Sequence, residues 1–216
     1  IDARRTVHPL IFQPVPNDLV TSAPLLITGA NASGKSTYLK TAALCAVMAQ
    51  SVCTCTAEAY HASAFRIYSS IALADDLLAG ESYYIVETKS LRRILESTGG
   101  NGPVLGVIDE VLRGTNTVER IAASSQVLSA LAEQGALCLA ATHDIELCVL
   151  LKGQYRLCHF EETVGETDMT FDYLLREGPA QTRNAINLLK IMGFDDILVE
   201  KAHARADRYL TEGVWR

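Results

Sequence analysis

The sequence predicts an α/β fold with a mostly parallel central sheet, an antiparallel β-hairpin and helices at the C-terminal end. Short apolar runs, typical of buried parallel strands, alternate along the chain with longer segments of helical periodicity. Two of these runs end in ionisable residues, and ligands bind at such strand ends in parallel sheets. A polar turn at 165–168 separates two further strand-like segments, which indicates the hairpin.

The predicted elements follow one another with short connections. Residues 10–12 give a strand signal, although the prolines around them favour extended or turn structure. We expect further strands at 25–28, 64–68, 104–108 and 136–141, and the hairpin at 155–164 and 169–176. Helices are expected at 35–50, 85–97, 118–134, 182–192 and 195–210. Residues 1–180 would form the core, including the N-terminal segment, and 181–216 a C-terminal helical segment. In the helix at 85–97, Glu87 and Lys89 should face outward, and Leu91, Ile94 and Leu95 inward.

The composition is that of an ordinary globular protein, with 49% hydrophobic and 20% charged residues among 216. A formal net charge of −6 argues against general nucleic-acid binding by this segment itself. We see no signal peptide and no apolar run near the ~18 residues of a membrane span. We therefore expect a cytoplasmic location and no membrane contact. The first residue is not Met, and we expect a domain of a longer protein. The six cysteines should be free thiols, several of them buried.

Residues 29–36 carry the most specific motif. They fit the pattern G-x-x-x-x-G-K-[ST] and lie between a predicted strand and a predicted helix. Glycines let successive backbone N–H groups point into one concavity, and the helix N-terminus adds partial positive charge. An accidental glycine-rich turn is the alternative, but the strand–loop–helix context favours phosphate binding. Lys35 would then reach the β- and γ-phosphates of ATP, Ser36 would ligate Mg²⁺, and Thr37 would lie near the α-phosphate. The predicted binding residues are Gly29, Ala30, Asn31, Ala32, Ser33, Gly34, Lys35, Ser36 and Thr37.

Ionisable residues follow two of the predicted strands. Asp109 and Glu110 come directly after the strand at 104–108. We expect Asp109 to hold Mg²⁺ through its water, and Glu110 to polarise the water that attacks the γ-phosphate. His143 follows the strand at 136–141, which should bring it to the same sheet edge, near that phosphate or that water. The alternatives are an acidic strand end that caps a loop, and a structural histidine.

Together these motifs resemble the ATPase domain of the MutS mismatch-repair family, within the ABC-type ATPases, which are P-loop NTPases. The family's G-P-N-M-[GA]-G-K-S-T-[YF] corresponds to residues 29–38, and its D-D-L-x-x-G-x-S-T-F-M-V-E to residues 75–87. Its D-E-[LIV]-G-R-G-T-S-T corresponds to residues 109–117, and its A-T-H to residues 141–143. The N-terminal R-H-P and P-N-D recur as Val7-His8-Pro9 and Pro16-Asn17-Asp18, with Val7 in place of Arg. The resemblance covers nearly the whole chain.

The resemblance implies that two ATPase domains pair and that each site is completed by its partner. Ser82 would donate across the dimer to the γ-phosphate, and it could also serve as the N-cap of the following helix. The loop at 114–117 would lie at the dimer seam. The last two helices resemble the family's dimerising helices, but their apolar faces could equally be intradomain core. These faces contain Ile186, Leu189, Leu198, Ala202 and Tyr209.

The chain departs from the family pattern at several positions. The family often places an aromatic residue before V-P-N-D, where it stacks on adenine. Pro14 stands at that position here, and Phe12 and Tyr173 are the candidates to replace the aromatic. The Asp-Gly pair after the G-T-S-T loop is replaced by Glu119-Arg120, and Thr-Phe after the serine by Tyr83-Tyr84. We expect a divergent member that retains the ATP chemistry, whereas its task need not be mismatch repair.

The sequence therefore predicts a Mg²⁺-dependent ATPase. The catalytic residues would be Lys35, Ser82, Glu110 and His143, and the metal ligands Ser36 and Asp109. Two copies would close as a homodimer over two nucleotides, and this closure would be coupled to DNA binding by domains outside this sequence. One alternative is an ABC-type ATPase of another system, although no L-S-G-G-Q-like motif occurs here. The other is a nucleotide-switched dimerisation module with little hydrolysis.

Overall fold

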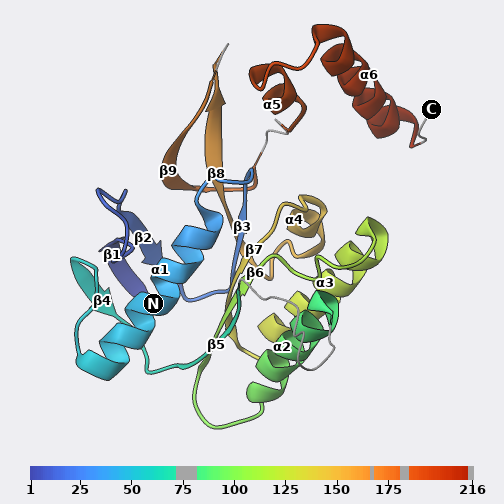
Figure 1. Cartoon of the computed structure of the whole chain (residues 1–216). Helices are drawn as coiled ribbons and strands as arrows, with labels where there is room; N and C mark the ends of the chain where they lie inside the picture. Colours follow the sequence, from blue (N-terminus) through green and yellow to red (C-terminus); the bar gives the residue numbers. More distant parts are fainter. Residues whose placement is uncertain (72–81, 166–167, 181–184, 214–216) are drawn as a thin grey trace.

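A six-stranded sheet in the order β5-β6-β7-β3-β8-β9 forms the centre of the protein (Figure 1). The structure is a computed structural model and describes residues 1–71, 82–165, 168–180 and 185–213. The strands β5, β6, β7, β3 and β8 pair in parallel with their neighbours in this order, and β9 pairs antiparallel with β8. This arrangement confirms the predicted mixed sheet with its hairpin. The strands are β3 (Leu25–Thr28), β5 (Arg66–Ser70), β6 (Val104–Asp109), β7 (Leu137–Ala141), β8 (Arg156–Val164) and β9 (Met169–Glu177).

Helices cover both faces of this sheet (Figure 1). Helix α1 (Lys35–Val52) lies on one face, and α2 (Tyr83–Ser97) and α3 (Thr117–Glu133) lie on the other. All residues of β3 and β7 are buried, because each strand has a helix layer on either side. At Gly106 of β6, an added Cβ would lie only 3.2 Å from Ile94 Cγ2, so the absence of a side chain lets α2 approach the sheet closely.

A three-stranded antiparallel sheet in the order β2-β1-β4 packs beside α1 (Figure 1). Its strands are β1 (Asp2–Thr6), β2 (Asn17–Val20) and β4 (Ala59–His61). The predicted strand at 10–12 is wrong, because these residues form a turn between β1 and β2. Leu10 and Phe12 are 86% and 88% exposed, and the prolines on both sides cannot donate ladder hydrogen bonds.

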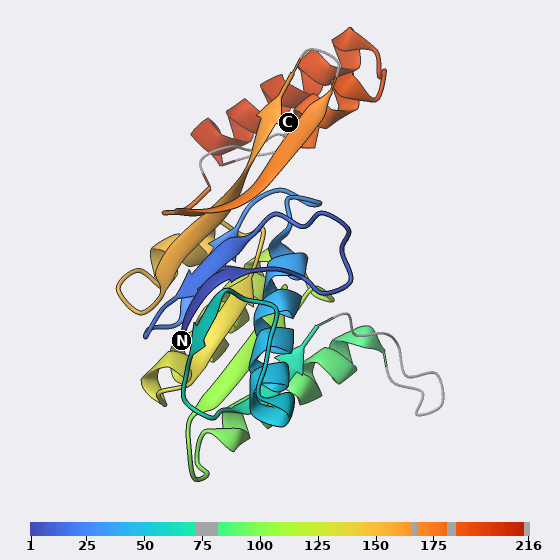
Figure 2. The same ribbon diagram turned by 90° about the vertical axis from the view of Figure 1, so that its left-hand side faces the viewer.

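The hairpin and the last two helices extend away from the main body of the protein (Figures 1 and 2). Helices α5 (Ala185–Ile191) and α6 (Asp196–Glu212) pack on each other and lie near the far end of β8 and β9. Val199 is buried, but Met192, Leu198 and Tyr209 are exposed in the single chain. Part of the apolar surface of these helices therefore does not contribute to the core of the chain.

The burial of the α2 side chains and the state of the cysteines agree with the sequence predictions except at one residue. In α2, Leu91 and Ile94 are buried as predicted, but the outward position predicted for Glu87 is wrong, since it is 1% exposed. All six cysteines are free, and Cys45, Cys138, Cys148 and Cys158 are buried. Across the described residues, none of the helices is both long enough and apolar enough to cross a membrane. One short helix, α4 (Glu146–Leu150), follows β7.

Candidate active site

The glycine-rich loop (residues 29–36) connects β3 to α1 in a tightly folded conformation. Gly29 has a φ of 142°, and a Cβ there would lie 2.7 Å from the carbonyl oxygen of Phe160, so glycine is required. Ala32 adopts a left-handed φ of 66°, and Gly34, with a φ of 109°, directly precedes α1. The first turn of α1 lines a cavity through Lys35, Ser36 and Thr37. A helix start that opens onto a cavity is suited to binding an anion.

Lys35 lies inside this loop. Its side chain is buried, and Nζ donates hydrogen bonds to the carbonyl oxygens of Gly29 at 2.7 Å and Ala30 at 2.8 Å. Burial lowers the pKa of Lys35, and the charges of Glu110 and Asp109 oppose that change. A phosphate oxygen would be a stronger, charged acceptor for this ammonium group than the two neutral carbonyls.

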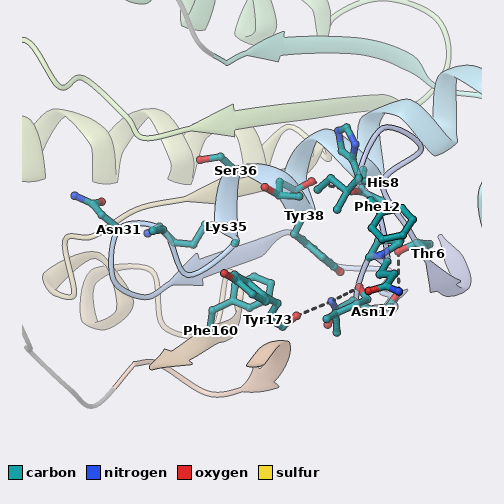
Figure 3. A pocket seen from close by; sticks show the side chains of 18 of the residues that line it. Thr6, His8, Phe12, Asn17, Asn31, Lys35, Ser36, Tyr38, Phe160 and Tyr173 are labelled. Atoms are coloured by element: carbon teal, nitrogen blue, oxygen red, sulfur yellow. Dashed lines mark hydrogen bonds between the residues drawn. The ribbon is translucent and has the colours of Figure 1, made fainter. Parts of the chain in front are cut away.

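A cavity of about 580 Å³ extends from the glycine-rich loop to the N-terminal segment (Figure 3). Asn31, Lys35 and Ser36 lie at one end, and His8 and Phe12 lie at the other. This volume is in the range of sites for small molecules and cofactors. Most of the predicted binding residues line the cavity, namely Asn31, Ala32, Gly34, Lys35, Ser36 and Thr37. Gly29 and Ala30 do not line the cavity, but their carbonyl oxygens accept hydrogen bonds from Lys35, which does. The hydroxyl of Ser33 is buried without a hydrogen-bond partner in the described residues.

The two candidate aromatic residues both line this cavity. Tyr173 of β9 has a left-handed φ of 56°, and Phe12 projects from the turn between β1 and β2. The Asn17 side chain supports the bend at Tyr173, since Nδ2 donates to the Tyr173 carbonyl at 2.9 Å and Oδ1 accepts from the Leu175 amide at 2.7 Å (Figure 3). From the sequence we identified Asn17 only as part of a family motif, so its role in orienting β9 was missed. The signal was its place in the P-N-D motif.

Glu110 and His143 meet at the carboxyl ends of β6 and β7. His143 Nδ1 lies 2.6 Å from Glu110 Oε2, and Arg113 Nη2 lies 3.2 Å from Glu110 Oε1. The Glu110 side chain is 7% exposed and that of His143 46% exposed. Glu110 and Arg113 line the same cavity as Lys35. The expected approach of these two strand ends is therefore found.

Opposing effects determine the charge of this pair. Burial raises the pKa of Glu110, but the hydrogen bond to His143 and the charges of His143, Arg113 and Lys35 together lower it. The hydrogen bond to Glu110 raises the pKa of His143, against the effect of its own burial. Both shifts favour a carboxylate beside an imidazolium. An ionised Glu110 can accept a proton or orient a water molecule.

Asp109 is the residue that could hold a cation. Its Oδ1 atom is buried and has no hydrogen-bond partner among the described residues, which is costly unless a ligand satisfies it. No group of three or more His, Cys, Asp or Glu side chains within the described part of the chain could hold a metal ion by itself. Asp109 is not among the residues that line the cavity with Ser36. One carboxylate and one hydroxyl would nevertheless suit Mg²⁺, which uses few protein oxygens and completes its shell with water and phosphate.

A second ion pair lies beside His143 and was missed from the sequence. Arg120, at the start of α3, donates from Nε and Nη2 to the two oxygens of Asp144, at 2.8 and 2.6 Å. The Asp144 backbone N–H also donates to Thr142 Oγ1 at 3.0 Å. Arg120 stood out in the sequence only as a departure from the family pattern. Its partner is 24 residues away, so local patterns could not identify it.

Ser82 makes no contact with the cavity in the single chain that would identify it as a site residue. It precedes α2 in an extended conformation, is exposed, and makes no capping hydrogen bond through its side chain. It is not among the residues that line the cavity. The rest of the predicted motif around it, residues 75–81, lies outside the described residues.

Comparisons with known proteins agree with these observations. The family model described as MutS domain V matches residues 25–209. The chain is similar to the DNA mismatch repair protein MutS of Thermus aquaticus, with 35% identity over 202 residues, 91% of this chain and 25% of that protein. It is 36% identical to MutS of Streptococcus pneumoniae (strain Hungary19A-6) over 191 residues, 87% of this chain and 22% of that protein. It is 34% identical to MutS of Natronomonas pharaonis over 206 residues, 90% of this chain and 24% of that protein. The chain thus spans about a quarter of the length of these relatives.

Proposed function

The chain belongs to the MutS family, as its motifs predicted, and we propose that it is the ATP-binding and ATP-hydrolysing domain of a MutS-like protein. One observation carries the proposal: Glu110 lines the same cavity as the glycine-rich loop and contacts His143 at 2.6 Å. An anion-binding loop and an ionised carboxylate in one cavity are the two parts that phosphate hydrolysis requires. The fold is then that of a P-loop NTPase of the ABC type.

In this proposal the cavity holds ATP along its length. The amides of the glycine-rich loop and Lys35 bind the phosphates, and the adenine lies toward Phe12 and Tyr173. Ser36 and Asp109 hold Mg²⁺, which neutralises phosphate charge when bound. Gly29, Ala30 and Ser33 shape the loop, while Asn31, Ala32, Gly34 and Thr37 contact the nucleotide.

Glu110 orients the water that attacks the γ-phosphate, because its carboxylate is fixed between His143 and Arg113. His143 holds Glu110 in place and remains half-exposed, so its ring can also reach the transferred phosphoryl group. Lys35 moves from its carbonyl partners to the phosphates as they bind, since charged acceptors compete better.

Pairing with a second copy would complete the site. Ser82 is exposed and is not among the residues that line the cavity of its own chain, which suits a residue that acts on a partner's nucleotide. The exposed apolar side chains of α5 and α6 suit a dimer contact, with 181–216 as a separate helical segment. Closure of the pair over ATP would be coupled to DNA binding elsewhere in the full-length protein, since the relatives are named as DNA mismatch repair proteins.

Replacing Glu110 by Gln tests the hydrolytic assignment. The variant should bind ATP with unchanged affinity but lose at least about 100-fold in kcat, because the carboxylate that orients water is gone. Glu133→Gln, at the exposed end of α3, is the matched control and should keep full activity. Equal and very low rates of ATP hydrolysis in Glu110→Gln and the unsubstituted chain would indicate a nucleotide-switched dimerisation module. Equal and high rates would mean that the catalytic base lies elsewhere.

A further inference from the structure

The backbone after β6 is held in an unusual conformation. Glu110 and Leu112 have left-handed φ values of 61° and 57°, although neither is glycine. Such residues persist only where the surrounding structure determines their conformation, and they often lie at functional sites. The direction of the Glu110 carboxylate therefore depends on what fixes residues 110–114.

Glu87 of α2 fixes this segment from one side. Its Oε1 accepts from the Leu112 amide at 2.6 Å and its Oε2 from the Arg113 amide at 3.1 Å. Only 1% of Glu87 is exposed. Burial raises the pKa of Glu87, whereas the two amide donors stabilise its ionised form. The two carboxylate oxygens of Glu87 thus accept hydrogen bonds from the consecutive amides of Leu112 and Arg113, two and three residues after Glu110.

Two further contacts hold residues 110–114 in place. Tyr84 lies one helical turn before Glu87, and a Cβ built on Gly114 would lie 2.8 Å from Tyr84 Cβ, so Gly114 is what lets α2 lie against this segment. From the opposite side, the buried Ser124 of α3 donates to the Val111 carbonyl at 3.2 Å. The segment is therefore held between α2 and α3, and α2 supplies the charged contact.

The first turn of α2 connects Glu87 to Ser82. The Ile85 and Val86 amides donate to the Ser82 carbonyl at 3.0 and 3.2 Å, so Ser82 is hydrogen-bonded to the first turn of the helix that contains Glu87. A displacement of one end of this turn is transmitted to the other, because a hydrogen-bonded helical turn moves as a unit. Ser82 faces solvent at one end, and the Glu87 carboxylate contacts the active-site backbone at the other.

We propose that Glu87 is a positioning residue that couples the start of α2, including Ser82, to Glu110 and Arg113 of the same chain. The inference rests on the proposed function and adds communication between the two sites of a dimer. When Ser82 engages the partner's nucleotide, Glu87 transmits the resulting position of α2 to the segment that orients Glu110. Hydrolysis in one site then depends on nucleotide occupancy of the other.

The test compares Glu87→Gln with Glu96→Gln, an exposed glutamate at the other end of the same helix. Gln keeps the size of the side chain but presents an N–H₂ group to one of the two amides. We expect kcat to fall about 10- to 100-fold while the KM for ATP and the Kd for ADP change less than about threefold. Glu96→Gln should match the unsubstituted chain. Equal kcat in all three proteins, or a fall in kcat matched by lost nucleotide affinity, would overturn the inference.

Coupling to Ser82 is tested by combining Glu87→Gln with Ser82→Ala. Because Ser82→Ala is expected to be nearly inactive, hydrolysis is followed in single turnovers with excess enzyme, where residual rates remain measurable. If both residues act through α2, the double variant should be no slower than the slower single variant, whereas multiplying losses would overturn the coupling. If Glu87→Gln unfolds below the assay temperature, Ser124→Ala is tested in its place with the same measurements. This substitution removes the hydrogen bond by which α3 holds the same segment. An unchanged kcat in a folded Ser124→Ala protein also counts against the inference. Failure of the proposed function is separate, since Glu110→Gln would then be as active as the unsubstituted chain.

Discussion

Arg120 and Asp144 form an ion pair through two hydrogen bonds of 2.8 and 2.6 Å, with side chains that are 14% and 7% exposed. The pair joins the start of α3 to the segment that follows β7. His143 Nε2 lies 3.7 Å from Asp144 Oδ1, and its Nδ1 contacts Glu110. The histidine is therefore placed between two carboxylates, one of which is largely neutralised by Arg120.

Loss of Arg120 should destabilise the domain more than loss of an exposed arginine. In Arg120→Met, Asp144 stays buried without its cation, and removing one partner of a buried pair costs about 3 kcal/mol of unfolding free energy. The control is Arg92→Met, whose ion pair with Glu96 is exposed and should be worth less than about 1 kcal/mol. Urea unfolding measures both. Similar losses in the two variants would show that the buried pair contributes no specific stability.

The Glu110–His143 contact should make stability depend on pH. The pKa of His143 is raised in the folded state, so its contribution is complete below the unfolded value of about 6.5 and is lost as pH rises through the folded value. The pKa of Glu110 is lowered, so its contribution is complete above about 4.3 and is lost as pH falls through the folded value. The difference in unfolding free energy between the unsubstituted chain and His143→Ala should therefore be largest between about pH 4.3 and 6.5. A difference that stays constant from acid to alkaline pH would contradict this prediction.

The sequence predicted the sheet and the glycine-rich loop because their signals are local. Buried parallel strands such as β3 and β7 are continuous apolar runs, and the loop pattern directly follows β3. Glu87 was assigned wrongly because a charged residue on a helix is usually solvated. Its partners are two amides of a segment 25 and 26 residues further along the chain, which no periodicity can reveal.

The N-terminal segment shows a different limit of sequence reasoning. Leu10 and Phe12 look like strand residues because they are apolar, yet they belong to an exposed turn. Phe12 lines the cavity with Tyr173, so an apolar residue there is explained better by a ligand than by a core. The role of Asn17 likewise depends on two hydrogen bonds to β9, with partners 156 and 158 residues further along the chain. A ligand in the cavity would explain Phe12, whereas contacts with β9 explain Asn17.

Tyr173 should contribute to binding of the base but not of the phosphates. In Tyr173→Ala, the affinity for ATP should fall about tenfold through loss of stacking, whereas inhibition by inorganic tripolyphosphate should stay the same. Asn17→Ala should have the same effect in weaker form, since the left-handed backbone at Tyr173 loses its support. Competition against a fluorescent ATP analogue measures both. Equal losses for ATP and tripolyphosphate would mean that the substitution disturbed the glycine-rich loop instead.

Ser82 should act on the nucleotide of a second copy. Turnover per chain should then rise with protein concentration as dimers form, and Ser82→Ala and Lys35→Ala should each be nearly inactive alone. An equal mixture of the two variants restores one complete site in each mixed dimer, because one chain supplies Lys35 and the other Ser82. About half of the dimers are mixed and each has one of two sites intact, so at most about a quarter of full activity should return. Coupling through Glu87 lowers this value further, because the intact site lies in the chain that carries Ser82→Ala. A mixture as inactive as its components, together with turnover that is independent of concentration, would overturn the assignment of Ser82 to a partner's site, because each chain would then hydrolyse ATP on its own.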